Sequence, residues 1–258
     1  MGFLSSIKAN LTWEQRYSLS FVRMFFWDIN WLKTLWLNFK ALPFCKGVKL
    51  PIIVSYNVKI KSIGTILLPD NAHTGMLSIG VIKIGAFEDN DYKTILNNEG
   101  CIKVGGILKI HPGARIYVQK GATLTLGNRV GFGANNKIVC FKSITIGDDF
   151  RMSWNSQLFD TDFHFLRNIT KDVYYQRNKP VVIGDNVFVG NGTTIGKGTV
   201  LPNGSVVSCM SKLSGDYSEF GDNLLISGVP GKVVKVGVEM SNGFRIDIEE
   251  QLSTMLEK

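Results

Sequence analysis

A six-residue repeat in the second half of the chain constrains its fold more than any other feature. Read from Ile183 in steps of six, the sequence is IGDNVF, VGNGTT, IGKGTV, LPNGSV and VSCMSK. Each step opens on an aliphatic residue, continues with Gly, Pro or Ser, and has Val, Thr or Ser in its fifth place. The same register runs from Ile146 to Leu158, and a looser version runs from Ile110 to Ile138. Self-similarity over consecutive steps indicates stacked structural repeats.

Short steps of this composition fit one architecture well. One large aliphatic residue followed by a small residue suits a short strand and a tight corner. Three such steps complete a triangular coil of a parallel β-helix, in which the aliphatic side chains point inward and stack on those of neighbouring coils. Glycine, present 27 times in 258 residues, lets the corners turn with a positive φ or lets backbones approach closely. A sandwich would show period-two strands in antiparallel hairpins instead, so we predict a mainly β chain wound as a parallel β-helix.

The repeat region, KPVVIGDNVFVGNGTTIGKGTVLPNGSVV, resembles the hexapeptide-repeat acyltransferases, and among them the bacterial surface-polysaccharide O-acetyltransferases. The resemblance covers roughly residues 100–235, and the closing segment of the family corresponds to ISGVPGKVVKV. It implies a left-handed coil, which is an exception to the right-handed crossover rule. It also implies a homotrimer that uses acetyl-CoA in clefts between subunits.

The sequence divides into three parts. We expect an N-terminal helical segment over residues 1–45, the β-helix domain over residues 46–236, and a C-terminal tail, predicted helical, over residues 237–258. From about Val48 onward, β-branched runs alternate with Gly, Asn and Asp, which are strand and turn signals.

The N-terminal segment is rich in aromatic residues, with apolar residues at helical spacing. Charged residues interrupt it, so it offers no uncharged stretch of about 20 residues that could span a bilayer. Two interpretations stay open. The segment could pack as a helical pair on the main body, or residues 13–39 could contact a membrane peripherally, with Trp27, Trp31 and Trp36 at headgroup level.

The charge balance of 29 Lys and Arg against 21 Asp and Glu gives a net charge of +8, which favours anionic partners. The cations are scattered, with no long basic run, so we do not expect nucleic acid as a partner. The first residues show no signal peptide. We therefore expect a cytoplasmic location, with the inner face of the membrane as a peripheral alternative.

The repeat register breaks after Leu158 and resumes at Ile183, which predicts an extruded loop over residues 159–181. The loop carries two acids and a histidine within five residues: Asp160, Asp162 and His164. Acyl transfer to a hydroxyl needs a base near the acceptor oxygen, and a neutral imidazole suits that task at pH 7. A carboxylate on the other ring nitrogen would fix its tautomer. In an extended run, alternation would place all three side chains on one face.

The resembled enzymes place a catalytic histidine at such a coil-exit loop, so the resemblance implies His164 as the general base. It would take the acceptor proton as the oxygen attacks the thioester. The sequence leaves open whether Asp160 or Asp162 orients the ring, and solvated loop acids are the alternative for both. No cysteine or serine constellation points to a covalent intermediate.

By the same resemblance, acetyl-CoA lies along the outside of the later coils. Candidate contacts are small residues that expose backbone groups and lysines that face phosphates: Gly190, Gly196, Ser208, Lys212, Lys232 and Lys235. Their alternative roles are plain corner residues and solvated lysines. Candidate acceptor contacts are Trp154, expected to point outward near the loop, and Arg177 within the loop. Trp154 could equally pack at a subunit interface.

Other functions stay open at this point. A metal-dependent hydratase on the same coil needs three converging histidines, whereas His73, His111 and His164 are scattered in the sequence. Cys/His pairs at zinc-ligand spacing are missing from the sequence, so we expect no metal. A non-catalytic β-helix and an N-acetyltransferase acting on an amino-sugar are further alternatives.

Overall fold

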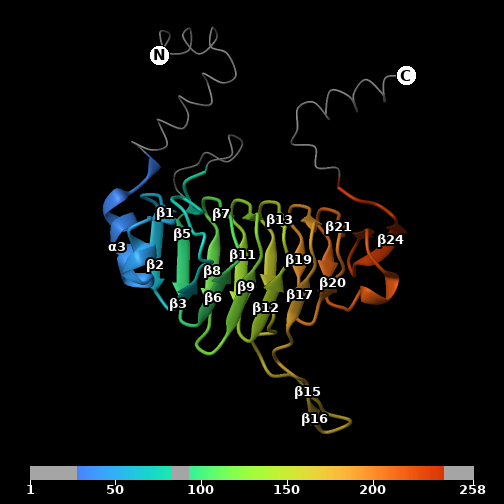
Figure 1. Ribbon diagram of the computed structural model, residues 1–258. Coiled ribbons are helices and arrows are strands. Elements are labelled where there is room, and N and C mark those ends of the chain that lie inside the picture. The colour runs from blue at the N-terminus through green and yellow to red at the C-terminus, as the bar shows by residue number, and fades with distance from the viewer. Residues whose placement is uncertain (1–27, 83–92, 241–258) are drawn as a thin grey trace, which may run out of the picture.

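Parallel strands wind into a three-sided prism, and successive turns of the chain add strands to each side (Figure 1). The computed structural model describes residues 28–82 and 93–240. Sheet 1 contains β1 (Ile52–Val54), β4 (Leu77–Ile79), β7 (Leu108–Ile110), β10 (Val130–Phe132), β13 (Arg151–Met152), β18 (Phe188–Val189), β21 (Val206–Val207), β23 (Leu224–Ser227) and β24 (Lys232–Val236). Sheet 2 contains β2 (Val58–Ser62), β5 (Thr94–Asn98), β8 (Arg115–Val118), β11 (Lys137–Cys140), β14 (Gln157–Phe159), β19 (Thr194–Ile195) and β22 (Lys212–Leu213). Sheet 3 contains β3 (Thr65–Leu67), β6 (Cys101–Val104), β9 (Thr123–Leu126), β12 (Ser143–Ile146), β17 (Val181–Ile183) and β20 (Val200–Leu201).

The core is a stack of aliphatic side chains that follows the sequence repeat. In sheet 3, Leu126 is in register with Ile146, Ile146 with Ile183, and Ile183 with Leu201. All four side chains are buried. Ile183 and Leu201 open repeats that stand three steps apart in the sequence, so one coil corresponds to three six-residue steps. The predicted mainly β architecture of stacked parallel strands is confirmed.

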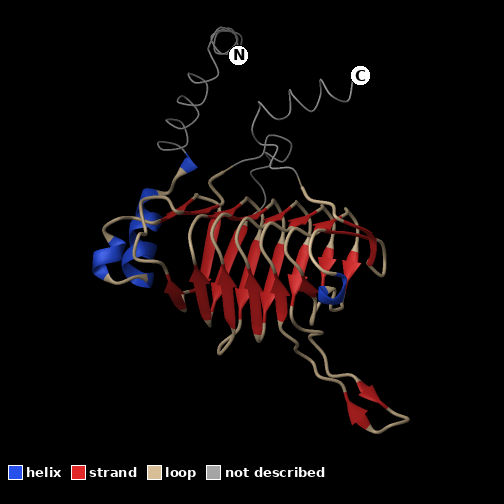
Figure 2. Cartoon of the chain, turned by 45° about the vertical axis from the view of Figure 1, so that its right-hand side comes forward, coloured by secondary structure: helices blue, strands red, loops and turns tan. Residues whose placement is uncertain are grey.

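Helices close the N-terminal end of the prism (Figures 1 and 2). Helix α3 (Trp31–Ala41) begins where Asn30 Oδ1 accepts a hydrogen bond from the Lys33 amide at 2.9 Å, a normal N-cap contact. The helix ends before Pro43, and the short α4 (Phe44–Gly47) follows. The remainder of the predicted helical segment, residues 1–27, lies outside the described residues, as do residues 241–258 of the tail.

Side chains of α3 satisfy the backbone of the first strand. Asn38 Nδ2 donates to the Ile52 carbonyl at 2.7 Å, and the Ile52 amide donates to Asn38 Oδ1 at 3.1 Å. The Val54 amide donates to Thr34 Oγ1 at 3.2 Å. An unpaired β1 edge would invite strand addition from another chain, so these contacts both dock the helix and blunt the edge. At the far end, β24 covers β23 in antiparallel pairing, after the 3₁₀ turn Ser218–Phe220.

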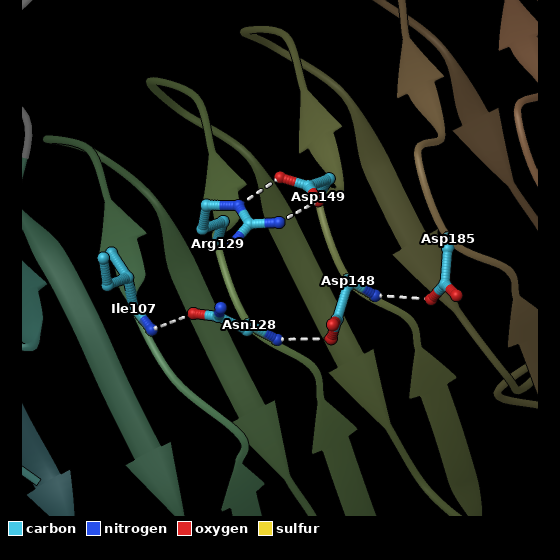
Figure 3. Close-up of polar contacts among 6 residues, drawn as sticks. All are labelled: Ile107, Asn128, Arg129, Asp148, Asp149 and Asp185. Carbon is cyan, nitrogen blue, oxygen red and sulfur yellow. Dashed lines mark hydrogen bonds and ion pairs between the residues drawn. The ribbon is translucent and has the colours of Figure 1, made fainter. Parts of the chain in front are cut away.

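A ladder of side-chain hydrogen bonds runs along the corner between sheets 3 and 1 (Figure 3). The Ile107 amide donates to Asn128 Oδ1, the Asn128 amide to Asp148 Oδ1, and the Asp148 amide to Asp185 Oδ1, at 2.7–3.0 Å. The ladder continues through Asn203. Beside it, Arg129 pairs with Asp149, and this hydrogen bond and charge hold the pKa of Asp149 below its usual range.

The second-place glycines of the repeat serve this ladder rather than a left-handed turn. A Cβ on Gly147 would lie 2.2 Å from Asp185 Oδ1, and one on Gly184 would lie 2.4 Å from Asn203 Oδ1. Neither glycine has a positive φ; that conformation falls two residues later, as at Asp149 (φ 58°) and Asn186 (φ 55°). Of the two roles expected for glycine, a positive φ and close approach of backbones, the second applies at Gly147 and Gly184.

Candidate active site

The extruded loop leaves the coil at the corner between sheets 2 and 3, after β14, and returns at β17. Its neck is closed by antiparallel pairing: the Asp162 amide donates to the Arg177 carbonyl at 3.0 Å, and the Lys179 amide donates to the Asp160 carbonyl at 2.9 Å. Beyond the neck, β15 (Arg167–Asn168) and β16 (Val173–Tyr174) form a hairpin that projects well away from the prism (Figures 1 and 2). A fixed base thus carries an exposed arm.

Asp160 is an anchor of that base. Its fully buried carboxylate accepts hydrogen bonds from the amides of Phe141, Lys142 and Ser143, each at 2.7 Å, on the corner of the preceding coil. Carboxylate bonds of this kind are about twice as strong as neutral ones. Burial, reinforced by the charge of Asp160, raises the pKa of the neighbouring Cys140 thiol to about 12. Asp160 therefore holds the loop to the coil. Both of its oxygens are occupied by backbone amides and not by the His164 ring.

Asp162 is a second anchor. Its carboxylate pairs with the ammonium of Lys197, which lies on the next coil. The same ammonium donates to the Gln176 carbonyl at 2.6 Å, on the returning strand of the neck. Lys197 thus ties both strands of the neck to the coil that follows. The sequence reading missed this lysine, because its position in the repeat IGKGTV carries no sign of its distant partners.

His164 is exposed on the loop, just beyond the neck. The expected alternation of Asp160, Asp162 and His164 on one face is broken, because Phe163 between them adopts a left-handed φ of 64°. Within the described ranges, the His164 ring forms no hydrogen bond or ion pair with another residue. The structure therefore displays His164 to solvent, and neither aspartate orients it within the protomer.

Aromatic rings gather at the base of the loop, around the sequence neighbours of His164. Tyr117 on β8 contacts Phe141 edge-on at 5.7 Å between centroids, Phe141 contacts Phe163 at 5.8 Å, and Phe159 contacts Phe163 at 5.9 Å. The Arg177 guanidinium lies 4.7 Å from the centre of the Phe165 ring and 6.0 Å from that of Phe141. We call Tyr117, Phe141, Phe159, Phe163, Phe165 and Arg177 the aromatic platform. Arg177 was predicted from its place in the loop, whereas the rings contributed by the coils were not.

Trp154 lies at a different corner of the prism. It stands between β13 and β14, where sheet 1 gives way to sheet 2, whereas the loop leaves at the far end of β14. The expectation that Trp154 lies close to His164 is therefore not met within one protomer. Gly190 and Ser208 lie on the same corner as Trp154: a Cβ on Gly190 would come within 2.5 Å of the Cys209 amide. Trp154, Gly190 and Ser208 thus form one group on successive coils.

The other predicted cofactor residues lie elsewhere on the later coils. Gly196 lies near the loop, since a Cβ there would be 3.9 Å from the Phe159 ring. Lys212, Lys232 and Lys235 are exposed. Lys232 lines a surface cavity of about 450 Å³ together with Tyr217 and Gly231. Across residues 28–82 and 93–240, no cluster of three or more His, Cys, Asp and Glu side chains is arranged to hold a metal ion.

Comparison with known proteins places the chain in a family. No model of a protein family matches the sequence. The chain is 35% identical over 201 residues, covering 76% of its length, to an "uncharacterized 24.8 kDa protein in cps region" of Klebsiella pneumoniae, of which 84% is covered. The chain belongs to this cps-region family. Among solved structures, this chain is similar to the "polySia specific acetyltransferase NeuO", with a TM-score of 0.52 and 20% identity over 80% of this chain and 87% of that one. That similarity shows a shared fold.

Proposed function

We propose that the protein is an acetyl-CoA-dependent O-acetyltransferase of the hexapeptide-repeat type, acting on a sugar hydroxyl of a surface polysaccharide or its precursor. The observation that carries this proposal is the display of His164 on a loop whose base is fixed to two neighbouring coils through Asp160 and Asp162. The cps-region relative and the fold shared with a polySia-specific acetyltransferase support the substrate class. The coil is taken as left-handed, as in the family it resembles.

His164 acts as the general base in this proposal. Its ring takes the proton of the acceptor hydroxyl while that oxygen bonds to the thioester carbon, and the C–S bond then breaks. The protonated ring returns the proton to the departing sulfur, giving the acetyl ester and free CoA. Asp160 and Asp162 contribute by fixing the loop, so they are positioning residues rather than partners of the ring.

Acetyl-CoA would lie along the outside of the later coils. The group at the corner of sheets 1 and 2, with Gly190 and Ser208, offers backbone groups beside small residues. Gly196, Lys212 and Lys232 lie toward sheet 2 and the C-terminal cavity, where ammonium groups could face phosphates. Gly196 comes after β19, at the other end of sheet 2 from Gly190 and Ser208, so we propose that a cleft between two protomers joins these sets.

A homotrimer would supply that cleft. The outward residues of sheet 3 are nearly uncharged, being mainly Thr, Ser and Val with Lys103 as the cation among its strands. A neutral β-branched face suits packing against another copy, since interface cores are depleted of charge. The exposed apolar residues of the projecting arm, such as Ile169 and Tyr174, would then be covered by the neighbouring protomer.

Helix α3 favours a peripheral membrane contact at the N-terminal end. Its outer face and the adjoining α4 region expose a stripe of large apolar side chains: Leu32, Leu35, Trp36, Phe39, Phe44 and Val48. Neither helix contains an acidic residue. Such a stripe beside lysines fits the interface of an anionic bilayer, although among the described residues no helix is long and apolar enough to span one. We propose a cytoplasmic protein docked by this stripe. Sedimentation with anionic vesicles should fall for Trp36→Asp, while Phe220→Asp, similarly exposed near the C-terminal end of the prism, should sediment as the unmodified protein.

Replacement of His164 tests the reaction. His164→Ala should lower acetyl transfer by about 100-fold or more, the usual contribution of a general base. Its urea unfolding should stay unchanged, because the exposed ring forms no hydrogen bond or ion pair with another described residue. Retention of full activity would refute the assignment. Hydroxylamine cleaves O-acetyl esters and spares amides, so a product that resists it would identify N-acetylation of an amino-sugar instead.

A further inference from the structure

The outward face of sheet 2 carries an unneutralised row of cations. Its strands expose five basic side chains and contain no acid: Lys59, Lys61, Arg115, Lys137 and Lys212. Register aligns four of them in one row, since Arg115 pairs with Lys137 on the next strand, and Lys59 and Lys212 occupy the same row further along the axis. Lys61 lies at a register shift within β2, beside this row. None of the five takes part in an ion pair with another described residue. Sheet 3, by contrast, has Lys103 as the cation of its strands.

A second row on the same sheet is aromatic. Tyr117 and Phe159 lie two residues after the cation row on their strands, which is a displacement of about 6.6 Å toward the loop. They belong to the aromatic platform, which leads through Phe141 and Phe163 to the neck below His164. Sheet 1 has cations in its middle coils too, at Lys109 and Arg151, but it has no such platform leading to the loop. Sheet 2 therefore differs from the other two sheets in carrying both a row of cations and rings that lead to the loop.

These two rows describe a ligand. Adjacent strands are about 4.8 Å apart, so the face offers positive charge at intervals along the axis of the prism, which suits a polymer that repeats its negative charge. Half-buried rings beside cations offer flat apolar surfaces on which the C–H faces of a pyranose can pack, while Tyr117 and Arg177 supply polar groups. A flat bilayer would make little use of half-buried rings, and a neutral polymer would leave the cations unused.

We infer that sheet 2 is the docking face for an anionic acceptor, a polysaccharide whose sugars carry carboxylate or phosphate groups. The row from Lys59 to Lys137 holds the anionic groups, while Lys212 at its end remains assigned to the donor phosphates. The aromatic platform seats the sugar whose hydroxyl faces His164. This inference rests on the proposed acetyl transfer and specifies its substrate. The like charges of sheet 2 also oppose its packing against the same face of another copy, because such juxtaposition is costly.

Matched charge variants test the inference. Arg115→Gln/Lys137→Gln removes two cations from sheet 2, and Lys49→Gln/Lys109→Gln removes two exposed cations that lie outside sheets 2 and 3, so the net charge is equal. The acceptor is the surface polysaccharide of the source organism, stripped of esters with mild alkali and separated by anion exchange into retained and unretained fractions. We expect acetylation of the retained fraction. The sheet 2 variant should raise KM for that fraction about 10-fold or more, with kcat and KM for acetyl-CoA changed less than twofold, and the control should match the unmodified enzyme.

Several results would overturn the inference. They are acetylation of the unretained fraction alone, an unchanged KM in the sheet 2 variant, or a rise confined to KM for acetyl-CoA, which would assign the cations to the donor phosphates. A lower mass of the sheet 2 variant by light scattering would assign these cations to a subunit contact. Tighter binding of a single-stranded oligonucleotide than of the anionic polysaccharide would assign them to nucleic acid.

A binding measurement separates this inference from the proposed reaction. His164→Ala, immobilised, should retain the anionic fraction with the affinity of the unmodified protein, and increasing the salt from 50 to 200 mM should weaken that binding at least 10-fold. Salt-sensitive binding without any transfer by the unmodified enzyme would refute the reaction and keep the docking face. Acetyl transfer without salt-sensitive binding would keep the proposed reaction and refute the docking face.

Discussion

Replacing Asp160 with asparagine should destabilise the protein strongly, although the side chain keeps its shape. The carboxylate accepts three backbone N–H bonds, one at Oδ1 from Phe141 and two at Oδ2 from Lys142 and Ser143. An asparagine has one acceptor oxygen, which can accept either from Phe141 or from the pair Lys142 and Ser143, but not from both. Its NH₂ group must then face at least one buried N–H donor at close range.

The magnitude follows from this geometry. In the better orientation the amide oxygen keeps the bonds from Lys142 and Ser143, but they lose their charge assistance, at about 1 kcal/mol each. The Phe141 amide loses its acceptor altogether, at about 2 kcal/mol for a bond to a charged group. The expected loss is therefore about 4 kcal/mol, a large share of the 5–15 kcal/mol that is typical of folded proteins. Because the same bonds fix the loop, transfer should fall as well.

Urea unfolding at one protomer concentration measures this loss, with Asp162→Asn as the matched control. That control removes a partly exposed ion pair with Lys197, which should change the free energy of unfolding by about 1 kcal/mol or less. An Asp160→Asn protein within about 1 kcal/mol of the unmodified one would refute the anchoring role. If it also lost all activity, a direct role of Asp160 in the chemistry would replace it.

Three further changes test other parts of the structure. Gly147→Ala should destabilise by about 1–3 kcal/mol in urea unfolding, because the added Cβ collides with the Asp185 rung and with Gly184; Gly131→Ala, with its nearest neighbour at 3.8 Å, should cost less, and equal losses would contradict the close-approach argument. Burial lowers the pKa of His111 in the folded state, so the unfolded chain takes up the proton first as the pH falls. Thermal unfolding should therefore show stability decreasing below pH about 6.5. His111→Gln should make this decrease smaller. Tyr217→Phe removes the hydrogen bond that the hydroxyl donates to the Gly231 carbonyl at 3.0 Å. In urea unfolding this should cost about 1 kcal/mol, and no change would mean that water donates to the carbonyl instead.

The fold could be predicted because its signal is local and repeated. The coils from Ile146 onward repeat the same rule of an inward aliphatic residue and a small corner residue, so a single misread step does not alter the conclusion. The break between Leu158 and Ile183 marked the loop for the same reason, and the chain leaves the coil between β14 and β17.

The site was less accessible from the sequence, because its contacts depend on stacking. Asp160 meets amides at residues 141–143, and Lys197 meets the loop neck from the following coil. Neither pairing follows from sequence spacing until the coils are aligned. The alternation argument for His164 failed at a single residue, since Phe163 leaves the extended conformation. Trp154 was placed with the loop by nearness in sequence, yet one strand is enough to carry the chain to another corner.

The corner ladder gives the prism a direction. Each Asn or Asp side chain accepts from the amide of the coil before it, so Asp148 completes the corner at Asn128, and Asp185 completes the corner at Asp148. A coil is therefore finished by its successor and never by itself. During synthesis, which runs from the N-terminus, the growing end always presents one amide awaiting a side chain that has yet to emerge. A chain truncated between coils would keep that vacancy, whereas one shortened from its N-terminus would leave only a spare acceptor, which water satisfies easily. The two ends of this protein should accordingly differ in how well they tolerate removal of a coil.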